Sequence, residues 1–303
     1  MKEVLVIGGS YFVGRIFSMV ALQEGWRLTL INRGTYSLSE LGDVTEFSCD
    51  RYDYDKLKTL PLKESYDAVV DFCAYDPGDI VQMFKNLPCH IKKYIYISTV
   101  DVCQSSSYVR DEKSPLQWKE PTDEVGLYTY NKMLLEKELV EAAESYNCKF
   151  TILRPAMIYG PYNYAPRESW YIEQIMHGEA LPHPVGADGQ FQMVYAKDVA
   201  RGIMLCIENE EADNKTYILS APEVFNYDSY VDLLRSVSDR DFKTTPVTVE
   251  DVLKNNIPLP FPLTPEENAL FNGQKIVNEL GFEYGDLKTS MQMTYNAFKT
   301  VFE

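Results

Sequence analysis

The stretch VLVIGGSYFVGR, residues 4–15, decides the fold. Its first four residues are apolar, and the glycines Gly8, Gly9 and Gly14 surround the start of a segment with helical periodicity. A short apolar run that meets glycines and then a helix is typical of the first βα unit of a parallel sheet. Such a turn presents backbone N–H groups at the positive end of the helix dipole, where a pyrophosphate can bind. The alternative is a tight turn that needs glycine for its dihedral angles and binds nothing.

Outward from this stretch, apolar runs alternate with segments of helical pattern. We expect buried strands at 3–7, 27–31, 66–71, 93–98 and 149–153. We expect helices at 12–23, 77–86 and 124–146. This alternation predicts an α/β protein with a Rossmann-like, doubly wound parallel sheet.

After Tyr159 the pattern gives way to a loop at 160–167, which is rich in proline and aromatic residues, and another at 180–189, and the two loops flank a helix. A helix at 197–208 and a strand at 216–219 then resume the α/β order. We therefore expect a smaller, interleaved C-terminal substrate lobe. The predicted nucleotide-binding domain comprises residues 1–160 and about 190–222, and the predicted substrate lobe comprises 161–189 and 223–303.

Composition excludes several classes of protein. The net charge is −16, from 45 acidic and 29 basic residues, and no run of lysine and arginine could follow a phosphate backbone, so nucleic acid is not an expected partner. The six cysteines show no metal-ligand spacing, and we expect no metal. No apolar run reaches membrane-spanning length, and the first residues run directly into a strand, so we expect a cytoplasmic protein with no membrane contact.

Asn32 and Arg33 stand near the end of the second predicted strand, where an NAD-preferring fold usually has an acidic residue on the ribose. No acid is available there to repel a 2′-phosphate, and Arg33 could pair with one. The expected cofactor is NAD or NADP, with NADP slightly favoured. The alternative is that Arg33 is a solvated turn residue.

Tyr128 and Lys132 are four residues apart on the longest predicted helix, so both project from one face. The same spacing also occurs at Tyr52 and Lys56, Tyr54 and Lys58, and Tyr284 and Lys288. Only the pair at Tyr128 follows a strand that ends in Ser98 and Thr99, at the edge where a doubly wound sheet binds its ligand.

This trio suits proton transfer. A tyrosine ordinarily has a pKa near ~10, and a lysine ammonium together with an oxidised nicotinamide would favour its phenolate. Thr99 would then hydrogen-bond the reacting hydroxyl. The alternative is a Tyr and a Lys on a helix face, with a threonine that only satisfies the backbone at a strand end.

These motifs together resemble the extended short-chain dehydrogenase/reductase superfamily, specifically the NAD-dependent epimerase/dehydratase family that acts on nucleotide sugars. The resemblance covers nearly the whole chain and also includes YISTVDV, YTYNK, LRPAMIYGP, VYAKDVA and KIVNELGF, which begin at residues 96, 128, 153, 194 and 275. It implies catalytic roles for Thr99, Tyr128 and Lys132. It implies a cofactor site of Gly8, Ser10, Tyr11, Phe12, Val13, Gly14, Asn32, Arg33, Asp50, Arg51, Cys73, Ala74, Tyr75, Tyr128, Lys132, Pro155 and Ile158.

Two positions depart from the usual family pattern or refine it. Tyr11 stands where the middle glycine of the loop is expected, so the loop must bend differently. Loops of this form, together with DFCAYDP at 71–77, resemble an atypical subgroup that includes chloroplast stem-loop-binding proteins associated with RNA. Asp101, in TVD, resembles the acid of nucleotide-sugar dehydratases and is a candidate lone base, although a solvent-facing carboxylate is the alternative.

The resulting hypothesis is an enzyme: an NAD(P)-dependent nucleotide-sugar epimerase or dehydratase that uses Tyr-assisted hydride transfer through a keto-sugar intermediate. Loop position suggests Tyr164, Arg167 and Gln192 as contacts for the nucleotide diphosphate. The first alternative is an NADPH-dependent carbonyl reductase of the same superfamily. The second is a non-catalytic cofactor-binding or RNA-associated protein. Similar proteins are commonly dimers, so the resemblance suggests a homodimer, while the residues themselves leave the oligomeric state open.

Overall fold

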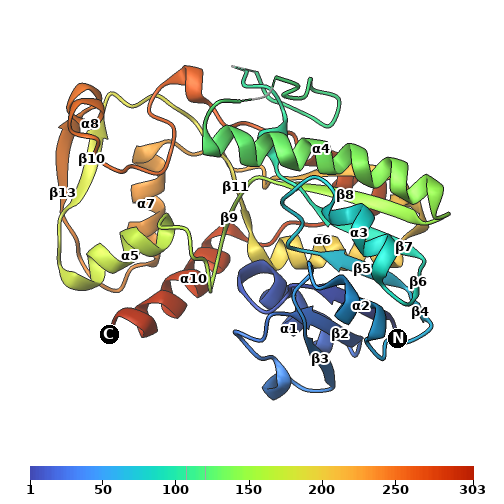
Figure 1. The fold of residues 1–303 in the computed structure, drawn as a ribbon. Helices are drawn as coiled ribbons and strands as arrows, with labels where there is room; N and C mark the ends of the chain where they lie inside the picture. The colour runs from blue at the N-terminus through green and yellow to red at the C-terminus, as the bar shows by residue number, and fades with distance from the viewer. Residues whose placement is uncertain (107, 120) are drawn as a thin grey trace.

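The core of the molecule is a seven-stranded sheet in the order β12-β8-β7-β5-β1-β2-β3 (Figure 1). The computed structural model describes residues 1–106, 108–119 and 121–303. The strands are β1 (Glu3–Ile7), β2 (Arg27–Asn32), β3 (Val44–Ser48), β5 (Ala68–Asp71), β7 (Lys93–Ile97), β8 (Lys149–Pro155) and β12 (Lys215–Leu219). Every neighbouring pair is parallel. The predicted α/β class with a doubly wound parallel sheet is confirmed.

Both faces of the sheet are covered by helices, as the alternation of side chains along a strand requires. On β1, Val4 and Val6 pack in one apolar cluster, whereas Leu5 and Ile7 pack in another. The first cluster includes α1 (Phe12–Gln23), α6 (Ala196–Glu208) and α9 (Gln274–Leu280). The second includes α2 (Tyr54–Thr59), α3 (Asp79–Asn86) and α4 (Glu124–Ser145). The sheet therefore lies between two helical layers (Figure 1).

The structure refines three sequence expectations. β3 was not expected, because it is an edge strand without a fully buried residue and so lacks the apolar run that identifies a strand. The strand expected at 66–71 is divided into β4 (Ser65–Tyr66), which pairs with β6 (His90–Ile91), and β5. The helix expected from residue 77 begins at Asp79, because Gly78 before it has a left-handed φ of 100°.

A second lobe, on the left of Figure 1, has its own apolar cluster. It contains α5 (Glu168–His177), α7 (Tyr227–Val237), α8 (Val249–Asn255), α10 (Leu287–Phe302) and the parallel strands β10 (Leu181–Val185) and β13 (Thr244–Thr248). Short parallel strands β9 (Met157–Tyr159) and β11 (Met193–Tyr195) stand where the chain passes into and out of it.

The exact division into domains stays a proposal, and one segment bears on it. Residues 223–303 were assigned to the substrate lobe, but Ile276, Leu280 and Phe282 pack in the cluster of the main sheet. The strand order reverses between β1 and β5, so their carboxyl ends open a crevice where doubly wound folds bind ligands. Across the described ranges, no helix is long and apolar enough to cross a membrane.

Candidate active site

Two adjoining hollows lie along the carboxyl edge of the sheet. One, of about 400 Å³, contains Thr99, Tyr128 and Lys132, and we call it the Lys132 hollow. The other, of about 360 Å³, contains Arg33, and we call it the Arg33 hollow. Tyr11 and Tyr75 line both. The other expected cofactor residues line one hollow or the other. Those that line the Lys132 hollow are Phe12, Val13, Gly14, Pro155 and Ile158. Those that line the Arg33 hollow are Gly8, Ser10, Asn32, Asp50, Arg51 and Cys73.

Helix α4 places Tyr128 and Lys132 one turn apart and directs both at the same hollow. Lys132 is only 3% exposed, and its Nζ donates to the carbonyl oxygens of Ala74 at 3.0 Å and Ile97 at 2.9 Å. The Nζ lies 5.8 Å from the centroid of the Tyr128 ring. These bonds anchor the ammonium between the ends of β5 and β7, while the Tyr128 ring remains 43% exposed in the hollow.

The electrostatics of the protein alone keep Tyr128 protonated. Burial and the Asp101 carboxylate both disfavour the phenolate and raise the pKa of Tyr128 to about 12. Burial lowers the pKa of Lys132 to about 8. From the sequence we expect the Lys132 ammonium and the positive charge of an oxidised nicotinamide together to favour the phenolate of Tyr128. Lys132 does not supply this shift by itself, so the positive charge of the cofactor would have to provide it.

Thr99 and Asp101 are coupled at the rim of the hollow. The Thr99 Oγ1 donates to the Asp101 Oδ2 at 2.9 Å and accepts from the Asp101 N–H at 3.2 Å. Asp101 is exposed, as the solvent-facing alternative supposed, yet it lines the Lys132 hollow. The threonine hydroxyl is therefore held in place by its neighbour, with its proton engaged.

We expect Asp101→Asn to lower the pKa of Tyr128. The change removes a negative charge that disfavours the phenolate, so less alkali is needed to ionise the phenol. Ultraviolet titration of tyrosinate, with Tyr128→Phe used to identify the signal, would measure the shift. A pKa of Tyr128 that stays constant or rises in the variant would refute this coupling.

The glycine loop carries Tyr11 where the family's middle glycine is expected, and the different bend that this implies stays a prediction. Gly8 and Gly9 adopt φ values of 86° and 77°, and Phe12 has a φ of 41° at the start of α1. A Cβ on Gly14 would lie 2.5 Å from the Gly9 Cα, so helix and loop approach too closely for any side chain there. Within the described residues no side chain caps α1, which leaves its first N–H groups for an anion.

The Arg33 hollow offers polar groups that suit a nucleoside. The Asn32 Oδ1 accepts from the Gly34 N–H at 2.7 Å, while the Asn32 Nδ2 is buried with no partner among the described residues. An unpaired buried donor is costly, so a ligand hydroxyl or ring nitrogen would satisfy it. Arg33 is exposed at the rim, and the Asp50 Oδ1 accepts from the Tyr52 N–H. These residues fit the adenosine half of a dinucleotide.

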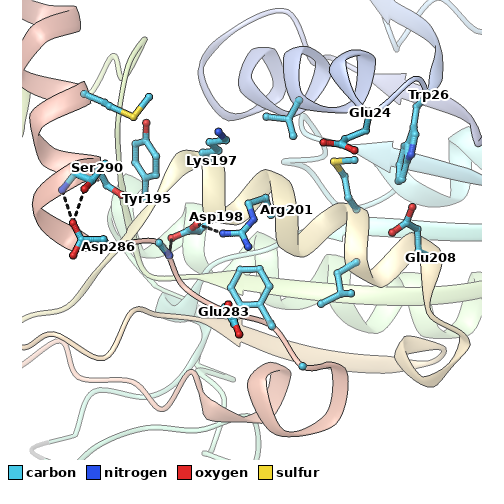
Figure 2. A pocket seen from close by; sticks show the side chains of 18 residues that line it. Glu24, Trp26, Tyr195, Lys197, Asp198, Arg201, Glu208, Glu283, Asp286 and Ser290 are labelled. Atoms are coloured by element: carbon cyan, nitrogen blue, oxygen red, sulfur yellow. Dashed lines mark hydrogen bonds and ion pairs between the residues drawn. The ribbon is translucent and has the colours of Figure 1, made fainter.

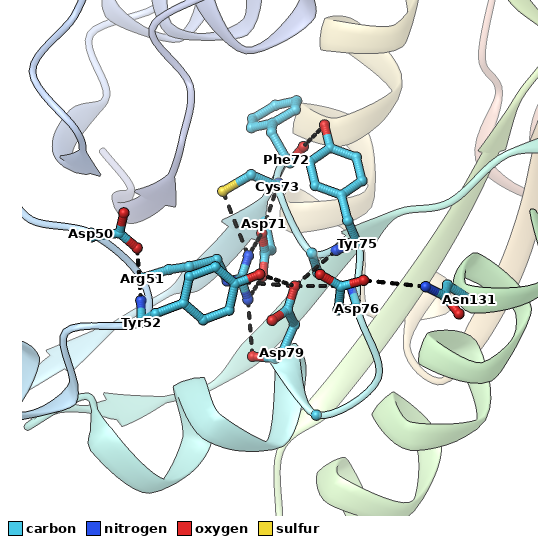
Figure 3. Close-up of polar contacts among 12 residues, drawn as sticks. Asp50, Arg51, Tyr52, Asp71, Phe72, Cys73, Tyr75, Asp76, Asp79 and Asn131 are labelled. Carbon is cyan, nitrogen blue, oxygen red and sulfur yellow. Dashed lines mark hydrogen bonds and ion pairs between the residues drawn. The ribbon is translucent and has the colours of Figure 1, made fainter. Parts of the chain in front are cut away.

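Arg51 has a structural role that the sequence did not reveal. Its guanidinium forms two hydrogen bonds with the buried Asp71 carboxylate, at 3.1 and 3.2 Å, and donates to the Asp79 carbonyl oxygen at 2.9 Å (Figure 3). The Asp79 carboxylate accepts from the Tyr75 N–H. Arg51 therefore lines the hollow and also holds the loop that carries Cys73 and Tyr75.

The Arg51 and Asp71 pair is charged although it is buried. Burial by itself raises the pKa of the Asp71 carboxyl, but Arg51 and the Tyr94 hydroxyl, 2.6 Å away, outweigh it and lower the pKa below its usual value. Asp71 also accepts from the Cys73 N–H at 2.9 Å. The network thus fixes the start of the loop whose Ala74 carbonyl holds Lys132.

The residues expected to contact a substrate separate into two groups. Tyr164 and Arg167 line the Lys132 hollow. Gln192 does not: it is 5% exposed, donates to the Ala221 carbonyl oxygen at 2.8 Å and accepts from the Phe271 N–H at 2.7 Å. Both ends of the Gln192 amide are thus bound to backbone, and Gln192 as a substrate contact stays a prediction. It positions the segment of Phe271, a lining residue that no sequence signal identified.

A larger hollow of about 700 Å³ lies between α1, α6 and the start of α10 (Figure 2). Its buried carboxylate, Asp198, accepts from Arg201 at 3.2 Å and from the Gly285 N–H at 2.9 Å. None of the candidate catalytic residues lines it. In residues 1–106, 108–119 and 121–303, no group of three or more His, Cys, Asp or Glu side chains is arranged to hold a metal ion.

Comparison with known families identifies the family of the chain. The model of the NAD dependent epimerase/dehydratase family matches residues 4–226. The chain belongs to this family. The family resemblance seen in the motifs is confirmed.

Individual relatives show the range of activities around this epimerase/dehydratase chain. UDP-glucose 4-epimerase of Vibrio cholerae is 26% identical over 245 residues, which are 72% of this chain and 70% of that protein. A chloroplast stem-loop binding protein of Arabidopsis thaliana is 27% identical over 75% of this chain, but the match spans only 61% of that protein. UDP-glucuronic acid 4-epimerase of Bacillus cereus, solved with NAD, has the same fold, with a TM-score of 0.76 and 17% identity over 99% of this chain and all of that chain.

Proposed function

We propose that this chain is an NAD(P)-dependent epimerase or dehydratase of nucleotide sugars. The observation that carries the proposal is the gathering of Thr99, Tyr128 and Lys132 in one hollow. That hollow adjoins the uncapped start of α1, and a second hollow with a free Asn32 amide continues it. Together they would accommodate a dinucleotide whose reactive end lies beside Tyr128.

The roles follow from the chemistry of each side chain. When bound, the nicotinamide supplies a reversible hydride acceptor. Tyr128 would take the proton of a sugar hydroxyl while the hydrogen on the same carbon leaves as hydride, so that a keto sugar remains, and Tyr128 would return the proton when the sugar is reduced again. Thr99 would orient that hydroxyl, and Lys132 would bind the ribose next to the nicotinamide. Reduction on the opposite face of the ketone gives the epimer.

The relatives support the substrate class. The Vibrio and Bacillus proteins are named as 4-epimerases of UDP sugars. In this chain Tyr164 and Arg167 would meet the diphosphate, since both line the Lys132 hollow and Arg167 carries a positive charge. Asp101, the candidate base of a dehydratase, lies in the same hollow.

Incubation with NAD and UDP-glucose or UDP-glucuronic acid, followed by NMR of the sugar, tests the proposal. An epimer formed without net consumption of NAD is the expected result. A 4-keto-6-deoxy product would identify a dehydratase, and stoichiometric consumption of NADPH with a carbonyl substrate would favour the reductase. If no sugar or carbonyl substrate reacts although a dinucleotide binds, the catalytic proposal fails.

The proposed preference for NADP over NAD rests on Arg33, whereas the Bacillus relative was solved with NAD. Arg33 is exposed at the rim of the Arg33 hollow, so its charge could reach a 2′-phosphate. We expect Arg33→Ala to weaken NADPH binding about tenfold and to leave NADH binding nearly unchanged. Equal losses for both dinucleotides in a fluorescence titration would show that Arg33 does not select the phosphate.

A second candidate is a non-catalytic, RNA-associated protein. The Arabidopsis relative is named as a stem-loop binding protein, which is the specific reason to test RNA. The net charge of −16 disfavours it. Binding of a stem-loop RNA that weakens steeply with salt would support this candidate.

We also propose that the protein is cytoplasmic and forms a homodimer. The Arabidopsis relative is named as a chloroplast protein, which makes the chloroplast the alternative location.

A further inference from the structure

Three exposed tyrosine rings stack on one another at the mouth of the two hollows. The centroid of the Tyr11 ring lies 4.9 Å from that of Tyr36, with the planes 15° apart. It lies 5.9 Å from that of Tyr164, with the planes 23° apart. The three side chains remain 42%, 47% and 69% exposed in the order Tyr11, Tyr36 and Tyr164. We call these three residues the tyrosine clasp.

The clasp joins three segments that are far apart in the sequence. Tyr11 belongs to the glycine loop, Tyr36 to the connection between β2 and β3, and Tyr164 to the connection between β9 and α5. The Tyr164 and Phe12 rings also lie nearly perpendicular to each other, with their centroids 6.0 Å apart. The clasp therefore links the edge of the main sheet to the entrance of the second lobe.

Its position matches the middle of a ligand that fills both hollows. Tyr36 lines the Arg33 hollow, Tyr164 lines the Lys132 hollow, and Tyr11 lines both. A dinucleotide with one nucleoside in each hollow has its diphosphate where the two hollows meet. That junction is beside Tyr11 and next to the uncapped N–H groups of α1.

We propose that the tyrosine clasp retains the dinucleotide by closing over its diphosphate, so that the cofactor leaves slowly between turnovers. This inference rests on the proposed function. Epimerisation returns the cofactor to its starting state in each cycle, so slow release of the cofactor does not limit the turnover rate of such an enzyme. Stacked aromatic pairs are weak enough to separate, and exposed rings can rotate without repacking a core, so the clasp still permits exchange.

The test measures the rate at which the loaded protein releases NADH. Protein saturated with NADH is mixed rapidly with excess NAD, and the loss of nicotinamide fluorescence gives the dissociation rate. We expect Tyr164→Ala and Tyr11→Ala each to accelerate release about tenfold. Because Tyr11 takes part in both stacked pairs, adding Tyr164→Ala to Tyr11→Ala should change the rate little.

Two matched variants separate stacking from other effects. Tyr164→Phe keeps the ring and removes the hydroxyl, so it should release NADH as slowly as the unmodified protein. Tyr162→Ala alters the same loop outside the clasp and should also leave the release rate unchanged. The centroid of the Tyr162 ring lies 5.3 Å from the Cζ of Arg15, so this ring belongs to neither stacked pair. Thermal melting of each variant would exclude loss of fold as the cause.

The outcomes are distinguishable. NADH that binds but leaves at the unmodified rate from both Tyr11→Ala and Tyr164→Ala overturns the clasp and leaves the proposed function standing. Slower release from these variants overturns it too, because it would mean that the rings obstruct the site. If the unmodified protein binds no NADH, the proposed function fails, and the clasp fails with it.

Discussion

Replacing Tyr128 with Phe is expected to lower turnover about a hundred- to ten-thousand-fold, the usual range for loss of a general base. The ring and its contacts in the Lys132 hollow are kept, and only the hydroxyl that exchanges the proton is lost. Dinucleotide affinity should therefore remain within about twofold of the unmodified value, since the change affects the transition state and not the bound cofactor. Initial rates of sugar conversion and a parallel NADH titration would measure both quantities.

Tyr130→Phe is the matched control for this prediction. Tyr130 stands on the same helix two residues away, but it packs with Val102, Cys103 and Met133 and does not line either hollow. Its loss of a hydroxyl should leave turnover close to the unmodified rate. Undiminished turnover in Tyr128→Phe would refute the assignment of Tyr128 as the base.

Replacing Asp71 with Asn is expected to destabilise the fold by about 3–5 kcal/mol, because the buried guanidinium of Arg51 loses the carboxylate that binds it twice and keeps only the more distant Asp79 carboxylate, at 3.7 Å. Asn keeps the size of the side chain, so cavity formation contributes little. Urea unfolding followed by circular dichroism would measure the difference. The same change should loosen the loop that holds Lys132 through the Ala74 carbonyl, and so weaken dinucleotide binding.

Asp232→Asn is the matched control, because Asp232 pairs with Arg235 on the surface at 3.4 Å and such pairs contribute about 0–1 kcal/mol. The pH dependence gives a second check. The pKa of Asp71 is lowered in the folded state, so its contribution is present at neutral pH and is lost as the pH falls through that lowered pKa. A loss of stability in Asp71→Asn no larger than that in Asp232→Asn would contradict the role of the buried pair.

Much of the fold could be predicted because the buried strands correspond to short apolar runs in the sequence. Strands covered on both faces are continuously apolar, as in Val4 to Ile7, and the glycines after β1 mark the turn. The edge strand β3 could not be found in this way, since it has no fully buried residue. Family membership was also predictable, because its motifs lie within contiguous segments at the ends of strands.

The parts of the site that depend on contacts between distant segments were less accessible. Arg51 looks like a cofactor residue in sequence, and only the fold shows that Asp71 and Asp79 engage it. Gln192 lies in a suitable loop, yet Ala221 and Phe271 bind its amide. Sequence gives the position of each polar group along the chain, whereas its partner depends on which distant segments the fold brings together.

Binding of a nicotinamide dinucleotide in the two hollows is tested most directly by a fluorescence titration of the nucleotide-free protein with NADH, followed by NADPH. We expect saturable binding of one dinucleotide per chain, with displacement by the oxidised form, because the two hollows adjoin at Tyr11 beside the uncapped start of α1. Failure of both dinucleotides to bind would contradict it. The loop containing Tyr11 would then have lost nucleotide binding, and RNA association would become the leading candidate.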